Sequence, residues 1–155
     1  MFKRILIPVD GSRTSELGLK TALKLAKVNG GTVRLLHVVE ENLFLLAGDY
    51  TSGAYLDRLF KELVQNGKAI LARSARLAKR RGVKTQTVLI EDLGGRRVAD
   101  LIVQQARKWR ADVIIIGTHG RRGLQRVVMG SDAEQVVRTA PVPVLLVRSP
   151  GRKSS

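Results

Sequence analysis

Short apolar runs alternate with longer segments of helical periodicity along the chain, and this alternation limits the fold more than any other feature. Runs such as Arg4–Val9 and Val113–Ile116 are almost continuously apolar, which is typical of parallel strands covered on both faces. Segments such as Ser12–Val28 carry apolar residues near helical spacing. The repeated order of strand and helix favours a single doubly wound, Rossmann-like α/β domain with helices on both faces of a parallel sheet.

Turn and cap residues divide the chain into five predicted strands and four predicted helices. The strands are Arg4–Val9, Thr32–Val39, Lys84–Ile90, Val113–Ile116 and Val142–Val147. The helices are Ser12–Val28, Ala54–Arg81, Arg96–Arg110 and Asp132–Thr139. We expect a variable loop at Asn42–Gly53, one domain over residues 1–148 and a flexible tail over residues 149–155.

Composition excludes several classes of site. The 155 residues include no Cys, which rules out disulfides and thiolate metal sites, and only two His. The net charge of +15 favours polyanionic ligands. Aromatic residues are only 4%, too few for the stacking platform of a single-strand binder, so we do not expect nucleic-acid binding. The start of the chain lacks a signal-peptide pattern, and no apolar run is long enough to span a membrane. We therefore expect a soluble, cytoplasmic protein.

A glycine-rich, basic segment follows the apolar run Val113–Ile116. It reads Gly117-Thr118-His119-Gly120-Arg121-Arg122-Gly123, and Gly130-Ser131 follows it just before a predicted helix. Glycines let backbone N–H groups approach a ligand closely, and phosphate binds where such groups converge at a helix N-terminus. The pattern predicts a loop that holds the phosphates of a nucleotide. The alternative is a surface loop in which Ser131 only caps its helix.

Asp10 follows the first strand, as the glycine-rich segment follows the fourth. If these strands are neighbours, both features lie where the strand order reverses, which is where ligands bind on such sheets. Asp10 would then contact ribose or adenine, or orient the loop. The alternative is an Asx turn or a helix cap.

Other signatures of nucleotide chemistry are absent from the sequence. No GxxxxGK[ST] loop occurs, no GxGxxG follows the first strand, and no GxSxG elbow is present. We interpret His119 as a surface residue or a ligand hydrogen-bond donor rather than a catalyst. No residue is clearly placed to activate water, so we name no catalytic residue and expect at most slow ATP hydrolysis.

With these motifs together, the chain resembles the universal stress protein (UspA) family, in its ATP-binding branch. The family pattern G-x2-G-x9-G-[ST] is met by Gly117, Gly120, Gly130 and Ser131. The opening Ile5–Ser12 and the closing Ala140–Val147 are also similar to the family. The resemblance covers residues 1–148.

The resemblance implies a five-stranded parallel sheet in the order 3-2-1-4-5. It implies that Asp10 and the backbone of Val38 hold adenine and ribose, that the glycines and Ser131 surround the phosphates, and that Met129 lies beside the nucleotide. The implied nucleotide site comprises Pro8, Val9, Asp10, Val38, Gly117, Thr118, Gly120, Arg121, Met129, Gly130, Ser131 and Asp132. It also implies ATP as the ligand, expected with Mg²⁺, and a homodimer formed through the fifth strand, whose apolar edge would otherwise invite uncontrolled pairing.

One residue departs from the family pattern. The position after Gly-Ser is commonly apolar in the family, but here it is Asp132. Its carboxylate would weaken phosphate binding, recruit Mg²⁺ or serve as a helix N-terminal charge. Arg121, Arg122 and Arg126 would offset it electrostatically.

A nucleotide-binding, stress-responsive regulatory or protective module is the favoured function. Three alternatives stay open: an ATP-dependent transferase on a related fold, a phospho-accepting receiver domain and a basic polyanion-binding accessory protein. Against the receiver alternative, the chain lacks the acidic pair expected after the first strand of a receiver domain and has Arg148 where a Lys is expected.

Overall fold

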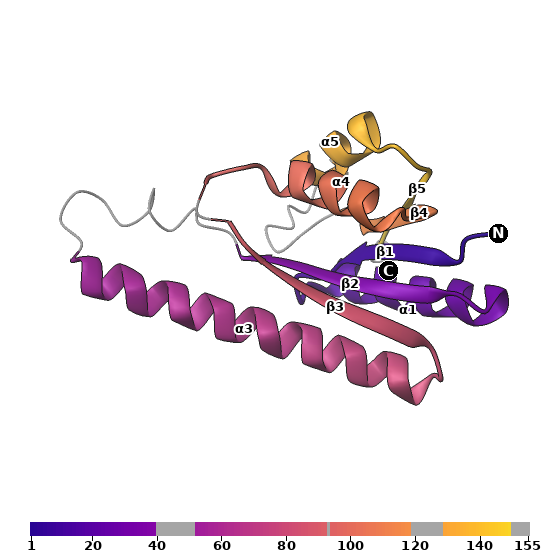
Figure 1. The fold of residues 1–155 in the computed structure, drawn as a ribbon, viewed down its shortest axis with the longest axis horizontal. Coiled ribbons are helices and arrows are strands. Elements are labelled where there is room, and N and C mark those ends of the chain that lie inside the picture. The colour runs from indigo at the N-terminus through magenta and orange to yellow at the C-terminus, as the bar shows by residue number, and fades with distance from the viewer. Residues whose placement is uncertain (40–51, 93, 119–128, 150–155) are drawn as a thin grey trace, which may run out of the picture.

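A single parallel sheet organises the chain in the computed structural model, which describes residues 1–39, 52–92, 94–118 and 129–149. Five strands lie in the order β3-β2-β1-β4-β5 (Figure 1). They are β1 (Arg4–Pro8), β2 (Thr32–Val39), β3 (Lys84–Glu91), β4 (Val113–Gly117) and β5 (Val144–Val147). Every pair of neighbours is parallel. The predicted fold class and strand order are therefore confirmed.

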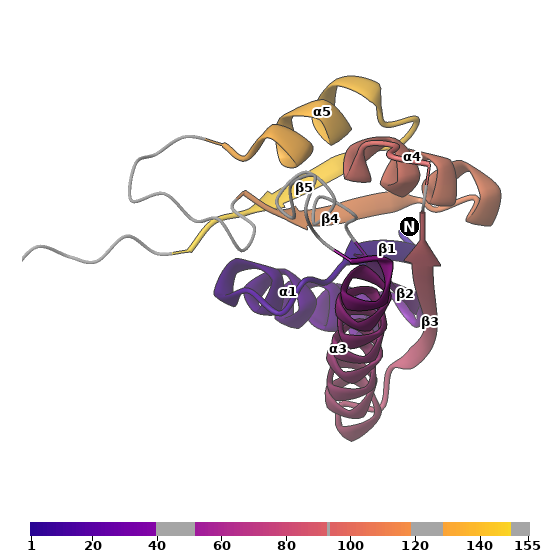
Figure 2. The same cartoon turned by 90° about the vertical axis from the view of Figure 1, so that its left-hand side faces the viewer.

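Helices cover both faces of this sheet. In the described residues they are α1 (Arg13–Asn29), α3 (Gly53–Arg80), α4 (Val98–Trp109) and α5 (Ser131–Thr139). Figure 2 shows α1 and α3 on one face and α4 and α5 on the other. The side chains of β1 point alternately to the two faces of the sheet, so this strand contributes to the core on both sides. Ile5 and Ile7 join the core cluster beneath α1 and α3, whereas Leu6 joins the cluster beneath α4 and α5.

The first helix has clear start and stop signals. The Ser12 hydroxyl accepts a hydrogen bond of 3.2 Å from the Ser15 amide, which satisfies one of the free N–H groups of the first turn. Gly30 ends the helix in the left-handed conformation, with φ of 61°. The predicted span Ser12–Val28 therefore differs from α1 by one residue at each end.

Two predicted elements begin two residues later than expected. Helix α4 begins at Val98 rather than Arg96, because the backbone and the guanidinium of Arg96 both donate to the Asp92 carboxylate and hold the preceding loop outside the helix. Strand β5 begins at Val144 rather than Val142. Pro143 precedes it, and proline has no N–H for a strand ladder. Most of the predicted loop Asn42–Gly53 lies outside the described residues.

Candidate functional site

The strand order reverses between β1 and β4. Strand β1 pairs with β2 on one side and with β4 on the other. The chain leaves β1 toward α1 on one face and leaves β4 toward α5 on the opposite face (Figure 2). The carboxyl ends of these two strands therefore mark the switch point of the sheet, and on doubly wound sheets ligands usually bind in the crevice at such a point.

The turn after β1 is held by its own polar groups. Asp10 accepts a hydrogen bond of 2.8 Å from the Ser12 amide through Oδ1, which is an Asx turn. The Asp10 amide donates to the Ser15 hydroxyl at 3.2 Å, and the Val9 amide donates to the Leu36 carbonyl at 2.8 Å. The structural role considered for Asp10 from the sequence is thus present. This turn fixes the position of the Asp10 carboxylate at the edge of the crevice.

A buried histidine supports this turn from behind. His37 lies within β2, and its Nδ1 is 2.6 Å from the Val9 carbonyl oxygen. Because a carbonyl only accepts, Nδ1 carries the proton of this bond. Gly67 of α3 makes room for the ring, since a Cβ there would lie 2.6 Å from His37 Cδ2. His37 is not among the site residues expected from the sequence, although its place inside the apolar run Leu35–Val39 is a signal for a buried side chain.

The end of β4 packs directly on the start of α1. A Cβ added to Gly117 would lie 3.1 Å from three atoms of Thr14, so the close approach of strand and helix favours glycine. Thr14 follows the turn that contains Asp10 and Ser12. The structure thus brings the first glycine of the spaced pattern next to the segment that begins at Asp10.

The start of α5 is joined to the end of β4. The Gly130 amide donates a hydrogen bond of 2.7 Å to the Thr118 carbonyl, and the Thr118 amide donates 3.0 Å to the Val147 carbonyl. Gly130 has an ordinary φ of −59°, so its conformation alone does not require glycine. A Cβ there would meet the Thr118 oxygen at 3.3 Å, a tight contact. Space rather than backbone strain favours glycine at this position.

The first turn of α5 offers free backbone donors. Gly130 is the N-cap and makes no side-chain capping bond. Ser131 is the first helical residue rather than the cap that was considered as the alternative. The Ser131 side chain is exposed, and Asp132 and Glu134 place acidic groups in the same turn. The early N–H groups of a helix lack internal acceptors and carry partial positive charge. They are suited to an anion.

Val38 and Met129 lie on the face of the sheet that α4 and α5 cover. Both are partly buried and pack against the core cluster beneath α4 and α5. Val38 is paired in register with Ile90 near the end of β2. Pro8 is the last residue of β1. The structure therefore brings Thr118 into contact with Gly130 and places Val38 and Met129 against one shared cluster.

Two predicted site residues, Gly120 and Arg121, lie outside the described residues, as do His119, Arg122 and Arg126. Within the described ranges, no group of three or more His, Cys, Asp or Glu residues is placed to hold a metal ion. None of the described helices has both the length and the apolar character needed to cross a membrane.

Comparison with known proteins gives one consistent family. Residues 1–148 match the universal stress protein family. Universal stress protein MJ0531 of Methanocaldococcus jannaschii is 35% identical over 153 residues, which cover 99% of this chain and 86% of that protein.

Solved structures share the fold. That of MJ0577, from the same organism, superimposes with a TM-score of 0.83 at 27% identity, covering 97% of this chain and 98% of that one. The universal stress protein from Archaeoglobus fulgidus in complex with dAMP gives a TM-score of 0.68 at 23% identity, covering 94% and 98%. With a family match over nearly its whole length, a close relative in sequence and the shared sheet order, the chain belongs to the universal stress protein family.

Proposed function

We propose that this chain binds an adenine nucleotide, ATP with Mg²⁺, at the crevice between β1 and β4. One observation carries the proposal most directly: the Gly130–Thr118 bond joins the free N–H groups of α5 to the end of β4, beside the turn that contains Asp10. Helix N-termini with glycine beside them are the common phosphate sites of α/β proteins. The complex of the Archaeoglobus fulgidus protein with dAMP supports an adenine nucleotide as the ligand class.

Several described residues have a proposed role. The Ser131 amide and hydroxyl would face phosphate oxygens, while the Gly130 amide stays bonded to the Thr118 carbonyl. Asp10, held through Oδ1 by the Ser12 amide, would accept a hydrogen bond from ribose or adenine. The backbone of Val38 and the side chain of Met129 would border the base. Gly120 and Arg121 are assigned to the phosphates from the sequence pattern alone.

Asp132 stands in the first turn of α5 in the role of a helix N-terminal charge. Mg²⁺ prefers carboxylate and phosphate oxygens, so a bound ion would offset this carboxylate beside the phosphates. The site would thus bind ATP with the metal more tightly than ATP alone. We propose a regulatory or protective module with slow hydrolysis at most, because no described residue of the site is placed as a base toward a phosphate.

A glycine substitution tests the proposal. Gly130→Val places a side chain between the phosphate position and the Thr118 carbonyl, and should reduce ATP affinity by at least about 100-fold. Gly53→Val is the matched control, because a Cβ at Gly53 has no neighbour within 4 Å. Calorimetry that gave equal ATP affinity for wild type and Gly130→Val would remove this loop from the site, provided both proteins show the same circular dichroism.

The assembly and location expected from the sequence belong to the same proposal. We infer a homodimer through the outer edge of β5, a single domain over residues 1–148 with a loose tail, and a cytoplasmic location. Sedimentation, limited proteolysis with mass analysis and cell fractionation test these three points.

A further inference from the structure

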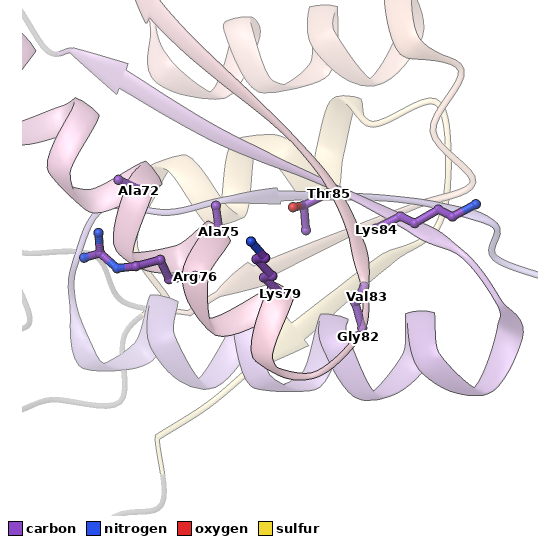
Figure 3. Close-up of a pocket in the computed structure, with 8 residues that line it drawn as sticks. All are labelled: Ala72, Ala75, Arg76, Lys79, Gly82, Val83, Lys84 and Thr85. Carbon is purple, nitrogen blue, oxygen red and sulfur yellow. The ribbon is translucent and has the colours of Figure 1, made fainter.

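A groove separates the second half of α3 from the edge strand β3, away from the candidate nucleotide site. Two adjoining cavities of about 460 and 450 Å³ lie along it and share Ala72 and Ala75. Figure 3 shows the residues that line the first of them. On the strand side they are lined by Thr85 and Thr87. We call this feature the α3–β3 groove.

Small side chains create the space. Alternate residues of a strand face the same side, so Thr85, Thr87 and Leu89 all point toward α3. Opposite them, α3 presents Ala72 and Ala75, the two residues that line both cavities. The floor is therefore apolar, with two hydroxyl groups along one wall.

Four cations surround this apolar floor. They are Lys68, Arg76, Lys79 and Lys84. None of them takes part in the ion pairs formed among the described residues. The sequence offers no nearby acid either, because the stretch from Leu63 to Ile90 holds seven Lys and Arg and no Asp or Glu. The rim thus concentrates positive charge that no ion pair among the described residues offsets.

Among the described residues, the outer edge of β3 also has no partner strand. Strand β3 lies at the margin of the sheet and pairs only with β2, over eight residues (Figure 2). No backbone hydrogen bond joins its other edge to another described segment. A bare strand edge presents N–H and C=O groups that another extended chain can pair with, and charged residues beside it select which chain does so.

We propose that the α3–β3 groove binds an acidic peptide segment of a partner protein in extended conformation. The segment adds to the outer edge of β3 through main-chain hydrogen bonds. Its alternate apolar side chains enter the groove over Ala72 and Ala75, and its carboxylates meet Arg76, Lys79 and the other rim cations. A nucleic acid fits less well, because the lining residues include no aromatic side chain for base stacking and the floor is apolar.

Fluorescence anisotropy with a defined probe tests this inference. The probe is a capped, fluorescein-labelled peptide of eight alternating Val and Glu residues, titrated with the full chain at physiological salt. We expect saturable binding that Arg76→Glu with Lys79→Glu weakens at least about tenfold. Lys24→Glu with Lys27→Glu is the matched control, since it makes the same charge change at the same spacing near the end of α1, away from the groove. The control should weaken binding by about threefold or less.

Two further measurements distinguish binding in the groove from general attraction between opposite charges. Ala72→Leu, at an exposed helix position, should fill the groove and weaken peptide binding without changing the net charge of the protein. A peptide N-methylated at alternate residues should bind less tightly, because it lacks the main-chain donors needed by β3. No saturable binding by wild type up to millimolar concentration overturns the proposal. Equal losses of peptide affinity in the two charge variants, or an unchanged affinity of the N-methylated peptide, also overturn it. Tighter binding of a thymidine octanucleotide at the same groove overturns it as well.

Discussion

The Gly130 amide donates a hydrogen bond of 2.7 Å to the Thr118 carbonyl, and this bond ties the start of α5 to the end of β4. The two residues are twelve positions apart in the chain, yet they meet at the point where the strand order reverses. The bond places the first turn of α5 at the end of β4, where Gly117 lies against Thr14 in the helix that follows the Asp10 turn.

Ser131→Ala should weaken ATP binding by about tenfold, because a hydrogen bond from the Ser131 hydroxyl to a charged phosphate contributes about 1.5 kcal/mol. The side chain is exposed at the first position of α5, so the free energy of unfolding should change by less than about 0.5 kcal/mol. Calorimetry and urea unfolding measure the two effects. Ser131→Thr keeps the hydroxyl and should retain affinity; equal losses in both variants would show that the hydroxyl has no role.

Gly117→Ala should destabilise the fold by about 1–3 kcal/mol, because the added Cβ lies 3.1 Å from backbone and side-chain atoms of Thr14 and forces α1 away from β4. Urea unfolding measures the change. Gly53→Ala serves as the control, since nothing lies within 4 Å of its Cβ position, and should stay within about 0.5 kcal/mol of wild type. A Gly117→Ala protein as stable as the control would mean that β4 and α1 pack less tightly than the 3.1 Å distance implies.

Asp92 should make a pH-dependent contribution to stability. Its hydrogen bonds to the Arg96 side chain hold the pKa of the Asp92 carboxyl below its ordinary value. A carboxyl with a lowered folded-state pKa stabilises the fold above the unfolded-state value, about 3.9, and this stabilisation is lost as the pH falls through the folded-state pKa. Asp92→Asn should therefore be less stable than wild type at pH 7 and equally stable in strong acid. Urea unfolding across this range checks the prediction, and a difference that did not change with pH would contradict it.

Leu146→Lys should convert the proposed homodimer to monomer. Leu145 and Leu146 of β5 are 41% and 37% exposed, which leaves apolar surface on an edge strand. Val144 packs against the core cluster beneath α4 and α5, so it is a poorer probe of association. Analytical ultracentrifugation at tens of micromolar gives the mass. Val28→Lys, at a position 86% exposed at the end of α1, should leave the dimer intact. A monomeric wild type would overturn the assembly.

Much of the fold could be predicted because local signals and long-range packing agree. Ser12 and Gly30 bound α1, and the apolar runs of β1 and β4 reflect burial by helices on both sides. The predicted start of α4 at Arg96 is wrong for a specific reason. Arg96 fits the helical periodicity but binds Asp92 instead, and such a contact cannot be inferred from periodicity.

The candidate site likewise has features that the sequence predicts and features that it does not. The spacing of Gly117, Gly130 and Ser131 is visible in the sequence, and the structure supplies a spatial reason for each glycine. The bond between His37 and Val9 joins residues 28 positions apart, and the α3–β3 groove depends on which face of α3 meets β3. Neither follows from spacing along the chain, because both arise only when separate elements pack together.

Calorimetric titration with ATP and Mg²⁺ tests the central claim most directly. The protein is first unfolded, dialysed and refolded to remove any nucleotide that co-purified, and its circular dichroism is compared with that before unfolding. The proposed site predicts saturable binding of one ATP per chain, with adenosine much weaker because it lacks the phosphates that α5 would bind. A refolded protein that gave no saturable heat with ATP up to millimolar concentration would contradict the assignment of this crevice as a nucleotide site.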